Sequence, residues 1–297
     1  MALVKYSDTN LPTPAEIRAT WCFGLPLSND TGGTMDDKDL QKFISAAIKE
    51  VERKLSIFLK PTAISCGPEE RGLVLGTDYE VEEPPYDYEI IKYRAWGFMQ
   101  FRQRPLKALT GLTLKLPNGM TIIDFITRPE WIKLYKKAAQ MHIVPYAGDP
   151  TLYYLLGGTQ SGFPFFTGQM NSNLPQMIYV DYVAGLGDKN PDYDPDQDDD
   201  DASPNPQYII AEDIRNVVAK IASCDALGIA SEAWSAGIAS QSTSIDGLSE
   251  SQSLTASAEN MIYSAHIAQY RKDIDAFFSP KGSSARASER GLTFIVL

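Results

Sequence analysis

Residues 36–61 read DDKDLQKFISAAIKEVERKLSIFLKP and carry the strongest periodic pattern in the sequence. Thr34 or Asp36 is placed to cap the amino end, where the early acids suit the positive end of a helix dipole. Pro61 stops a helix. The spacing therefore predicts a helix over residues 36–59 that packs one face into a core. The apolar positions at helical spacing are Leu40, Phe43, Ile44, Ala47, Ile48, Val51, Leu55 and Leu59.

From about residue 70 to residue 185 the pattern is typical of strands. The segments YEIIKYRAWGFMQF, LTGLTLKL, MTIIDFI, WIKLY and MHIVP are rich in β-branched and aromatic residues and are bounded by turn residues. Asn118-Gly119 stands between two apolar runs, which is the strongest short signal for a hairpin. A further strand is predicted at Met177–Ala184, ended by Gly185, after a long loop rich in Gly and Phe. This part of the chain is therefore expected to be an antiparallel β-region.

Helical spacing returns beyond an acidic run. A helix is predicted through Ile210, Ile214, Val217, Val218 and Ile221, with Gly228 as its stop. The next segment, GIASQSTSIDGLSESQSLTAS, is small and polar, with isolated apolar residues. A last helix, ended by Pro280, is predicted from the stripe Tyr263, Ile267, Tyr270, Ile274, Phe277 and Phe278.

This order of elements predicts an α+β protein. We expect a helical bundle formed by helices distant in sequence, with an inserted antiparallel β subdomain and an extended C-terminal strand. In the simplest compact arrangement, the helices pack together and the β subdomain projects from the helical bundle. The expected divisions are 1–65 (N-terminal arm and first core helix), 66–187 (inserted β-rich subdomain), 188–205 (acidic loop), 206–280 (core helices) and 281–297 (tether and C-terminal docking strand).

The chain has 297 residues and a net charge of −11, which is unevenly spread. Asp188–Asp201, DKNPDYDPDQDDDD, holds eight Asp and one Lys, and so contributes −7 by itself. The negative net charge of the whole chain argues against general affinity for nucleic-acid phosphates. Alternate aspartates in the run resemble a calcium loop, but Gln197 stands where the tight turn needs Gly, and Ser203 stands where Glu would close the site. A solvated loop is the favoured interpretation.

Membrane and secretion signals are not evident in the sequence. No apolar run approaches the roughly 20 residues that span a bilayer. The first residues, MALVKYSDTNLPTPAEIR, lack the apolar core of a signal peptide, so we expect a cytosolic protein or one assembled in the cytosol. Cys22, Cys66 and Cys224 lack metal-ligand spacing and are expected to be small buried residues in a reducing compartment.

No catalytic constellation is recognisable, so we expect no enzyme, no metal and no cofactor. The two histidines, His142 and His266, form no helical metal-ligand pair, and both are interpreted as structural. An alternative site is a carbohydrate or nucleic-acid surface, because Arg94, Arg102 and Arg104 lie near Trp96, Phe98 and Phe101 in sequence. Half-buried strands are the favoured interpretation of these aromatic residues.

The end of the sequence reverses the usual polar character of a terminus. A loose, slightly basic run, Ser279–Arg290, is followed by the uncharged segment Gly291–Leu297. A strand on a flexible tether is suited to adding itself to a sheet of another chain. The alternative is pairing with the protein's own β-region. The predicted partner-binding residues are Leu292, Thr293, Phe294, Ile295, Val296 and Leu297.

Several segments resemble one protein family. DDKDLQKFISAAIKEVERKL resembles the opening helix of head–tail connector proteins, or adaptors, of tailed bacteriophages. FRQRPLKALTGLTLKLPNG resembles the Arg-Pro strand and hairpin of larger members. The order of YVDYVAGLG, DIRNVVAKIASCDALG, SIDGLSESQSL and MIYSAHIAQYRKDIDAFF is similar to that in neck proteins of larger contractile-tailed phages. The resemblance covers most of the chain, except the acidic run and the Gly/Phe loop.

The resemblance implies a structural virion protein of the neck, assembled in the host cytoplasm. It implies a homo-oligomeric ring, expected to be a dodecamer, that lies under the portal protein and joins capsid to tail. A tail completion or tail terminator protein is the implied partner on the other side, and packaged DNA would pass through the channel without sequence-specific binding. The alternative is another virion binding module, a baseplate or decoration component whose β-rich region binds a partner or a glycan.

Overall fold

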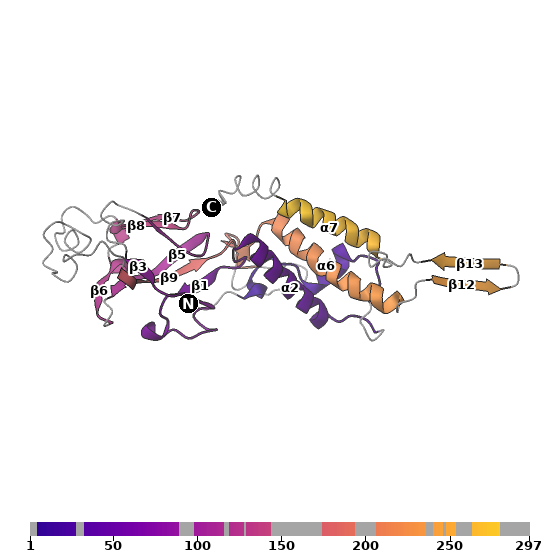
Figure 1. The fold of residues 1–297 in the computed structure, drawn as a ribbon, viewed down its shortest axis with the longest axis horizontal. Coiled ribbons are helices and arrows are strands. Elements are labelled where there is room, and N and C mark those ends of the chain that lie inside the picture. Colours follow the sequence, from indigo (N-terminus) through magenta and orange to yellow (C-terminus); the bar gives the residue numbers. More distant parts are fainter. Residues whose placement is uncertain are drawn as a thin grey trace. The chain divides into compact units, whose positions relative to one another are not determined.

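The protein contains both helices and antiparallel sheets in the computed structural model, which confirms the α+β prediction (Figure 1). The chain forms two compact units. Among the described residues, the first holds residues 5–8 and Ile57–Asp188, and the second holds Thr9–Ser56 and the described chain from Lys189 to residue 279. The structure describes residues 5–27, 33–88, 98–115, 119–127, 129–143, 174–193, 206–235, 240–245, 248–253 and 263–279.

The first unit is built on a six-stranded sheet with strand order β2-β1-β9-β5-β6, in which β3 also pairs with β9. Only the β1–β2 pairing is parallel among these ladders. The long β9 is the organising strand, because β1, β3 and β5 all pair with it. The strands are β1 (Thr62–Ser65), β2 (Val81–Glu82), β3 (Tyr86–Tyr88), β5 (Leu106–Lys115), β6 (Thr121–Asp124) and β9 (Leu174–Ala184).

A smaller sheet in the same unit has the order β4-β8-β7, and all its pairings are antiparallel. The predicted β-segments appear as strands where the structure describes them, while residues 89–97 of the first segment lie outside the described residues. β5 and β6 pair antiparallel, as the Asn118-Gly119 turn signal predicted. Gly119 has a φ of 83°, which the turn requires, while Asn118 lies outside the described residues. The remaining elements of the unit are β4 (Phe98–Gln100), β7 (Ile132–Tyr135), β8 (Gln140–Ile143) and the 3-10 helices η1 (Tyr6–Asp8), η3 (Glu69–Arg71), η4 (Phe125–Thr127) and η5 (Pro129–Trp131).

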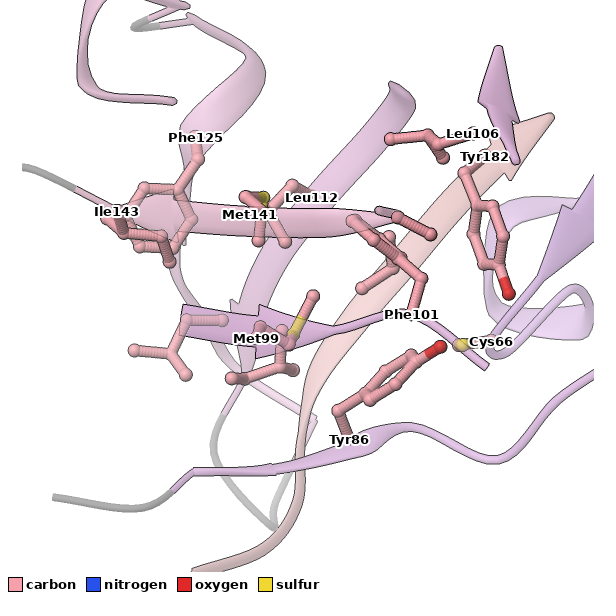
Figure 2. Close-up of a cluster of buried hydrophobic side chains, with 14 of the residues drawn as sticks. Cys66, Tyr86, Met99, Phe101, Leu106, Leu112, Phe125, Met141, Ile143 and Tyr182 are labelled. Atoms are coloured by element: carbon pink, nitrogen blue, oxygen red, sulfur yellow. The ribbon is translucent and has the colours of Figure 1, made fainter. Parts of the chain in front are cut away.

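The core of the first unit gathers side chains from both sheets into one cluster. Alternate residues of β9 point into it, and Val180 and Tyr182 are fully buried. Figure 2 shows Met99 and Met141, from the smaller sheet, in the same cluster as Leu112 of the main sheet. The two sheets therefore share one hydrophobic interior.

The second unit holds the helices. α6 contacts both α2 and α7, although the three helices are far apart in sequence. The elements are α1 (Pro14–Glu16), η2 (Ile17–Trp21), α2 (Asp37–Leu55), α6 (Glu212–Ser235), α7 (Ser264–Phe278), β10 (Asp188–Lys189), β11 (Tyr208–Ile209), β12 (Ser240–Ile245) and β13 (Leu248–Ser253).

The first predicted helix is present but ends earlier than expected. Asp36 caps α2, since its carboxylate accepts a hydrogen bond from the Asp39 N–H at 2.9 Å. The helix stops at Leu55 because Ser56 adopts a left-handed conformation, with a φ of 53°. The carbonyls of Phe58 and Leu59 instead accept hydrogen bonds from the chain that follows β9. The predicted end at residue 59 was therefore wrong.

The helix predicted to stop at Gly228 continues to Ser235. Gly228 lies in open space, where no atom would meet an added Cβ, so no close approach requires glycine there. Leu227 and Ala230, on either side of it, are fully buried. Because the residues on both sides of the glycine are buried, continuing the helix is favoured over ending it. The low helix propensity of Gly228 costs about 1 kcal/mol relative to alanine.

The N-terminal arm is tied to the helices by polar contacts. Asn10 forms two hydrogen bonds with the backbone of Ile210, at 3.0 and 2.7 Å, in the manner of a strand pair. The Tyr270 hydroxyl donates to the Trp21 carbonyl at 2.7 Å, and the Tyr263 hydroxyl donates to the carbonyl of Pro26 at 3.1 Å. The two tyrosine bonds satisfy carbonyls of the arm, and the Asn10 side chain satisfies the backbone N–H and carbonyl of Ile210.

Candidate interaction surfaces

The predicted partner-binding residues Leu292, Thr293, Phe294, Ile295, Val296 and Leu297 all lie outside the described residues. Most of the predicted acidic loop lies outside them as well. Its described beginning is ordered by neighbours: the Lys107 ammonium donates to the Asp188 carboxylate at 2.6 Å. The side chain of Asn190 accepts from the Asp192 N–H at 3.1 Å and donates to the carbonyl of Pro206.

The histidines do not join a cluster of metal-ligating side chains. His142 lies on β8 between two aromatic rings, and His266 lies beside the ring of Tyr270 on α7. In the described part of the chain, no three His, Cys, Asp or Glu side chains are grouped so as to hold a metal ion. Within the described ranges, no helix combines the length and hydropathy needed to cross a bilayer.

The cysteine thiols are shielded from water. Burial raises the pKa of Cys66 to about 11 and that of Cys224 to about 11, and it also raises the pKa of Cys22. The thiolate is the nucleophilic form of cysteine, and these environments hold the thiols protonated at neutral pH. Cys22 and Cys66 are therefore small buried residues, as the sequence predicted, whereas Cys224 is only partly buried.

A buried carboxylate organises the polar part of the first core. Glu83 accepts hydrogen bonds from the hydroxyls of Tyr182, at 2.8 Å, and Tyr86, at 3.2 Å. Those hydroxyls in turn accept from the backbone N–H groups of Gln103 and Arg102. Burial raises the pKa of both tyrosines, which therefore remain protonated donors. This network fastens the chain after β4 to the main sheet.

The arginine and aromatic residues weighed as a ligand surface do not form one shared face. Phe98 is 41% exposed, whereas Phe101 is buried. The Arg102 guanidinium lies 4.1 Å from the centre of the Tyr86 ring and donates to the carbonyl of Pro84. Arg94 and Trp96 lie outside the described residues. Phe101 is therefore part of the core, and the exposed Arg102 side chain packs on the Tyr86 ring.

The outer face of the main sheet is closed by an ion pair under η3. Arg71 pairs with Asp181 of β9, and each side chain is about one-sixth exposed or less, at 15% and 16%. The Ser65 hydroxyl also donates to Asp181, at 2.6 Å, and Arg71 donates to the hydroxyl of Thr113 at 2.8 Å. Arg71 and Asp181 therefore neutralise each other on this face.

The segment between α6 and α7 contains a β-hairpin that the sequence did not predict. β12 and β13 pair antiparallel from Ser240↔Ser253 to Ile245↔Leu248 and form a two-stranded sheet of their own. No other described strand pairs with either edge. A single hairpin is marginally stable in water, and open edges are templates for pairing with another chain. The Asp246-Gly247 dipeptide between the strands is the signal that could have revealed the hairpin.

Comparisons with known proteins leave the family open. No protein-family model and no curated protein matches the chain. One similar solved structure is described as the neck of an empty gene transfer agent particle, with 13% identity over 75% of this chain and 81% of that chain, and a TM-score of 0.36. Another is described as the virion of a native gene transfer agent particle, with 15% identity over 91% and 93% of the two chains, and a TM-score of 0.37. At these TM-scores neither match establishes a shared fold.

Proposed function

We propose that this chain is a structural protein of a phage-like virion neck, a head–tail adaptor rather than an enzyme. Its copies form a ring, a dodecamer by the family resemblance, under a portal protein. The ring extends the DNA channel and presents a surface to a tail completion or tail terminator protein. The order of sequence segments that resemble adaptors supports this proposal.

The observation that carries the proposal is the β12–β13 hairpin. Its two strands leave one unpaired edge each among the described residues. Its sequence, SQSTSI followed by LSESQS, has no alternating apolar face that could pack on a core of its own chain. Pairing with hairpins of neighbouring copies would satisfy the edges by main-chain hydrogen bonds. In a closed ring, that gain repeats at every interface.

The test replaces residues 241–252 by a short Gly-Ser linker. Portal-bearing heads that lack a neck are incubated with the wild-type or the variant chain, and the bound copies are counted by cryo-electron microscopy. We expect a closed ring with the wild type and none with the variant. Thermal melting of the free chains should be nearly the same, because the hairpin packs on no described strand.

Gln241→Thr is the matched control. It changes one side chain of the hairpin but preserves strand propensity and every backbone group, so rings should still form. If the variant without the hairpin still forms closed rings, the hairpin is not part of the interface between copies. A wild-type chain that binds elsewhere on the particle, away from the portal, would contradict the adaptor proposal itself.

A further inference from the structure

A row of ring-bearing side chains lies on the outer face of the small sheet. The pairing register aligns Phe98 of β4, His142 of β8 and Lys133 of β7 across the three strands. The His142 ring lies 5.8 Å from the ring of Phe98 and 5.4 Å from that of Tyr135, measured between centroids. Phe98 is 41% exposed and Tyr135 is 56% exposed. Two large aromatic side chains are therefore partly exposed beside a lysine.

The turn between β7 and β8 adds two more lysines. Its backbone is held by hydrogen bonds to neighbouring segments. Its Lys136 carbonyl accepts the N–H groups of Leu106, at 2.9 Å, and Ala139, at 3.2 Å. The Gln100 side chain donates to the carbonyls of Ala138, at 2.8 Å, and Ala139, at 3.0 Å. The backbone of the turn is thus fixed to its neighbours, while Lys136 and Lys137 are exposed.

These lysines differ from the other described lysines within Ile57–Asp188. Lys60, Lys107 and Lys115 each form an ion pair with a carboxylate. Lys133, Lys136 and Lys137 form no ion pair with any residue that the structure describes. The hairpin itself, residues 132–143, contains no Asp or Glu. In a chain with a net charge of −11, it is a local concentration of positive charge.

We propose that this face, which we define as Phe98, Lys133, Tyr135, Lys136, Lys137 and His142, binds nucleic acid without sequence preference. The lysines would contact phosphates, and the open rings would pack against bases or sugars. An acidic protein segment, such as the aspartate run of a second copy, would satisfy the lysines but would offer no row of bases to stack on the exposed ring of Tyr135. The combination of rings and lysines favours nucleic acid for that reason.

The test measures binding of the full chain to two fluorescent probes, a single-stranded DNA oligonucleotide and the matching duplex, by anisotropy. The triple variant Lys133→Ala/Lys136→Ala/Lys137→Ala should bind at least about tenfold more weakly at about 50 mM salt. Its log–log salt slope on single-stranded DNA should be smaller by about 2, which corresponds to three lost phosphate contacts. Tyr135→Ala should weaken single-stranded binding about tenfold and Tyr135→Phe should not, if the ring stacks on bases.

The control is Lys38→Ala/Lys42→Ala/Lys272→Ala, which removes the same charge from exposed lysines of the other unit. It should retain nearly all binding. Equal losses in the two triple variants, or no binding of the wild type to either probe, would overturn the proposal. So would a wild type that binds a synthetic peptide of residues 188–201 but neither DNA. The test uses the purified chain alone, so its outcome is independent of the neck assignment.

Discussion

Gly185 follows β9 at a place where the chain passes close to another backbone segment. Its φ is 153°, and an added Cβ would lie 2.8 Å from the Lys60 carbonyl carbon, 2.9 Å from the Pro61 Cα and closer still to the Lys60 carbonyl oxygen. Backbone atoms cannot move aside as a flexible side chain can. The sequence marked this glycine only as the end of a strand, whereas the structure shows why no other residue fits.

We predict that Gly185→Ala lowers the free energy of unfolding of the first unit by about 3 kcal/mol, because it adds both strain and a clash. Gly76→Ala is the matched control. Gly76 has a φ of 82° but open space around it, so only backbone strain of about 1 kcal/mol is added. Urea unfolding followed by circular dichroism measures both variants. Equal costs would show that close approach is not what selects glycine at position 185.

Cys66 gives a prediction for alkaline pH. Burial raises its pKa from 9.0 to about 11 in the folded protein, which favours the neutral thiol. The resulting stabilisation is fully present below pH 9 and is lost as the pH rises through about 11. The loss is about 2–3 kcal/mol. Tyr86 and Tyr182 also have raised pKa values and add to the alkaline instability at higher pH.

Cys66→Ala separates the thiol from the tyrosines. The variant should be less stable at neutral pH, because it loses buried volume, but its stability should decline less between pH 9 and 11. Thermal melts at intervals over that range provide the measurement. Parallel wild-type and variant curves would mean that burial does not raise the pKa of the thiol above its value in the unfolded chain.

Among the elements, α6 is distinguished by a buried face made of small residues. Ala222, Ala226 and Ala230 are all buried, and α6 contacts both α2 and α7. Small side chains let neighbouring helices approach closely, so no room is left on this face of α6 for a larger side chain. That packing explains how a helix with weak amphipathic patterning can run for 24 residues.

We predict that Ala226→Leu destabilises the second unit by about 1–3 kcal/mol through overpacking. Ala276→Leu makes the same change at an exposed position of α7 and should alter stability by less than about 0.5 kcal/mol. Chemical unfolding of both variants tests the difference. A stabilising effect of Ala226→Leu would reveal unfilled space beside α6.

At the scale of the whole molecule, we propose that the C-terminal segment takes part in assembly. If Leu292–Leu297 forms a strand on the portal, Leu292, Phe294 and Val296 would share one face, and the alternate residues would share the other. Both faces are mainly apolar, so the strand would be buried on both sides. Each buried Phe or Ile would contribute about 1.5–3 kcal/mol, repeated in every copy of a ring.

Truncation after Arg290 should therefore leave the melting temperature of the free chain nearly unchanged and abolish attachment to portal-bearing heads. Differential scanning calorimetry and co-sedimentation with heads measure the two effects. Leu292→Ala is a milder variant and should weaken attachment without abolishing it. A truncated chain that attaches normally, or that loses its own fold, would instead assign the segment to this protein's own β-region.

Local signals in the sequence determined the elements that depend on neighbouring residues. The apolar stripe and the Asp36 cap were sufficient for α2, because helix contacts and caps span only a few residues. Asn118-Gly119 was sufficient to predict the β5–β6 hairpin, because a tight turn is set by its own residues. The alternating strands of the first unit followed from the same kind of short-range pattern.

Tertiary structure alone decided the rest. The end of α2 at Ser56, the passage of α6 through Gly228 and the pairing of β1 with β9 depend on partners distant in sequence. The same holds for the face that joins Phe98, Tyr135 and His142, because strand register, not sequence spacing, brings these side chains together. A sequence pattern specifies which faces of an element are apolar. It does not specify which other element covers a face, and that choice determines both where helices end and which side chains form a surface.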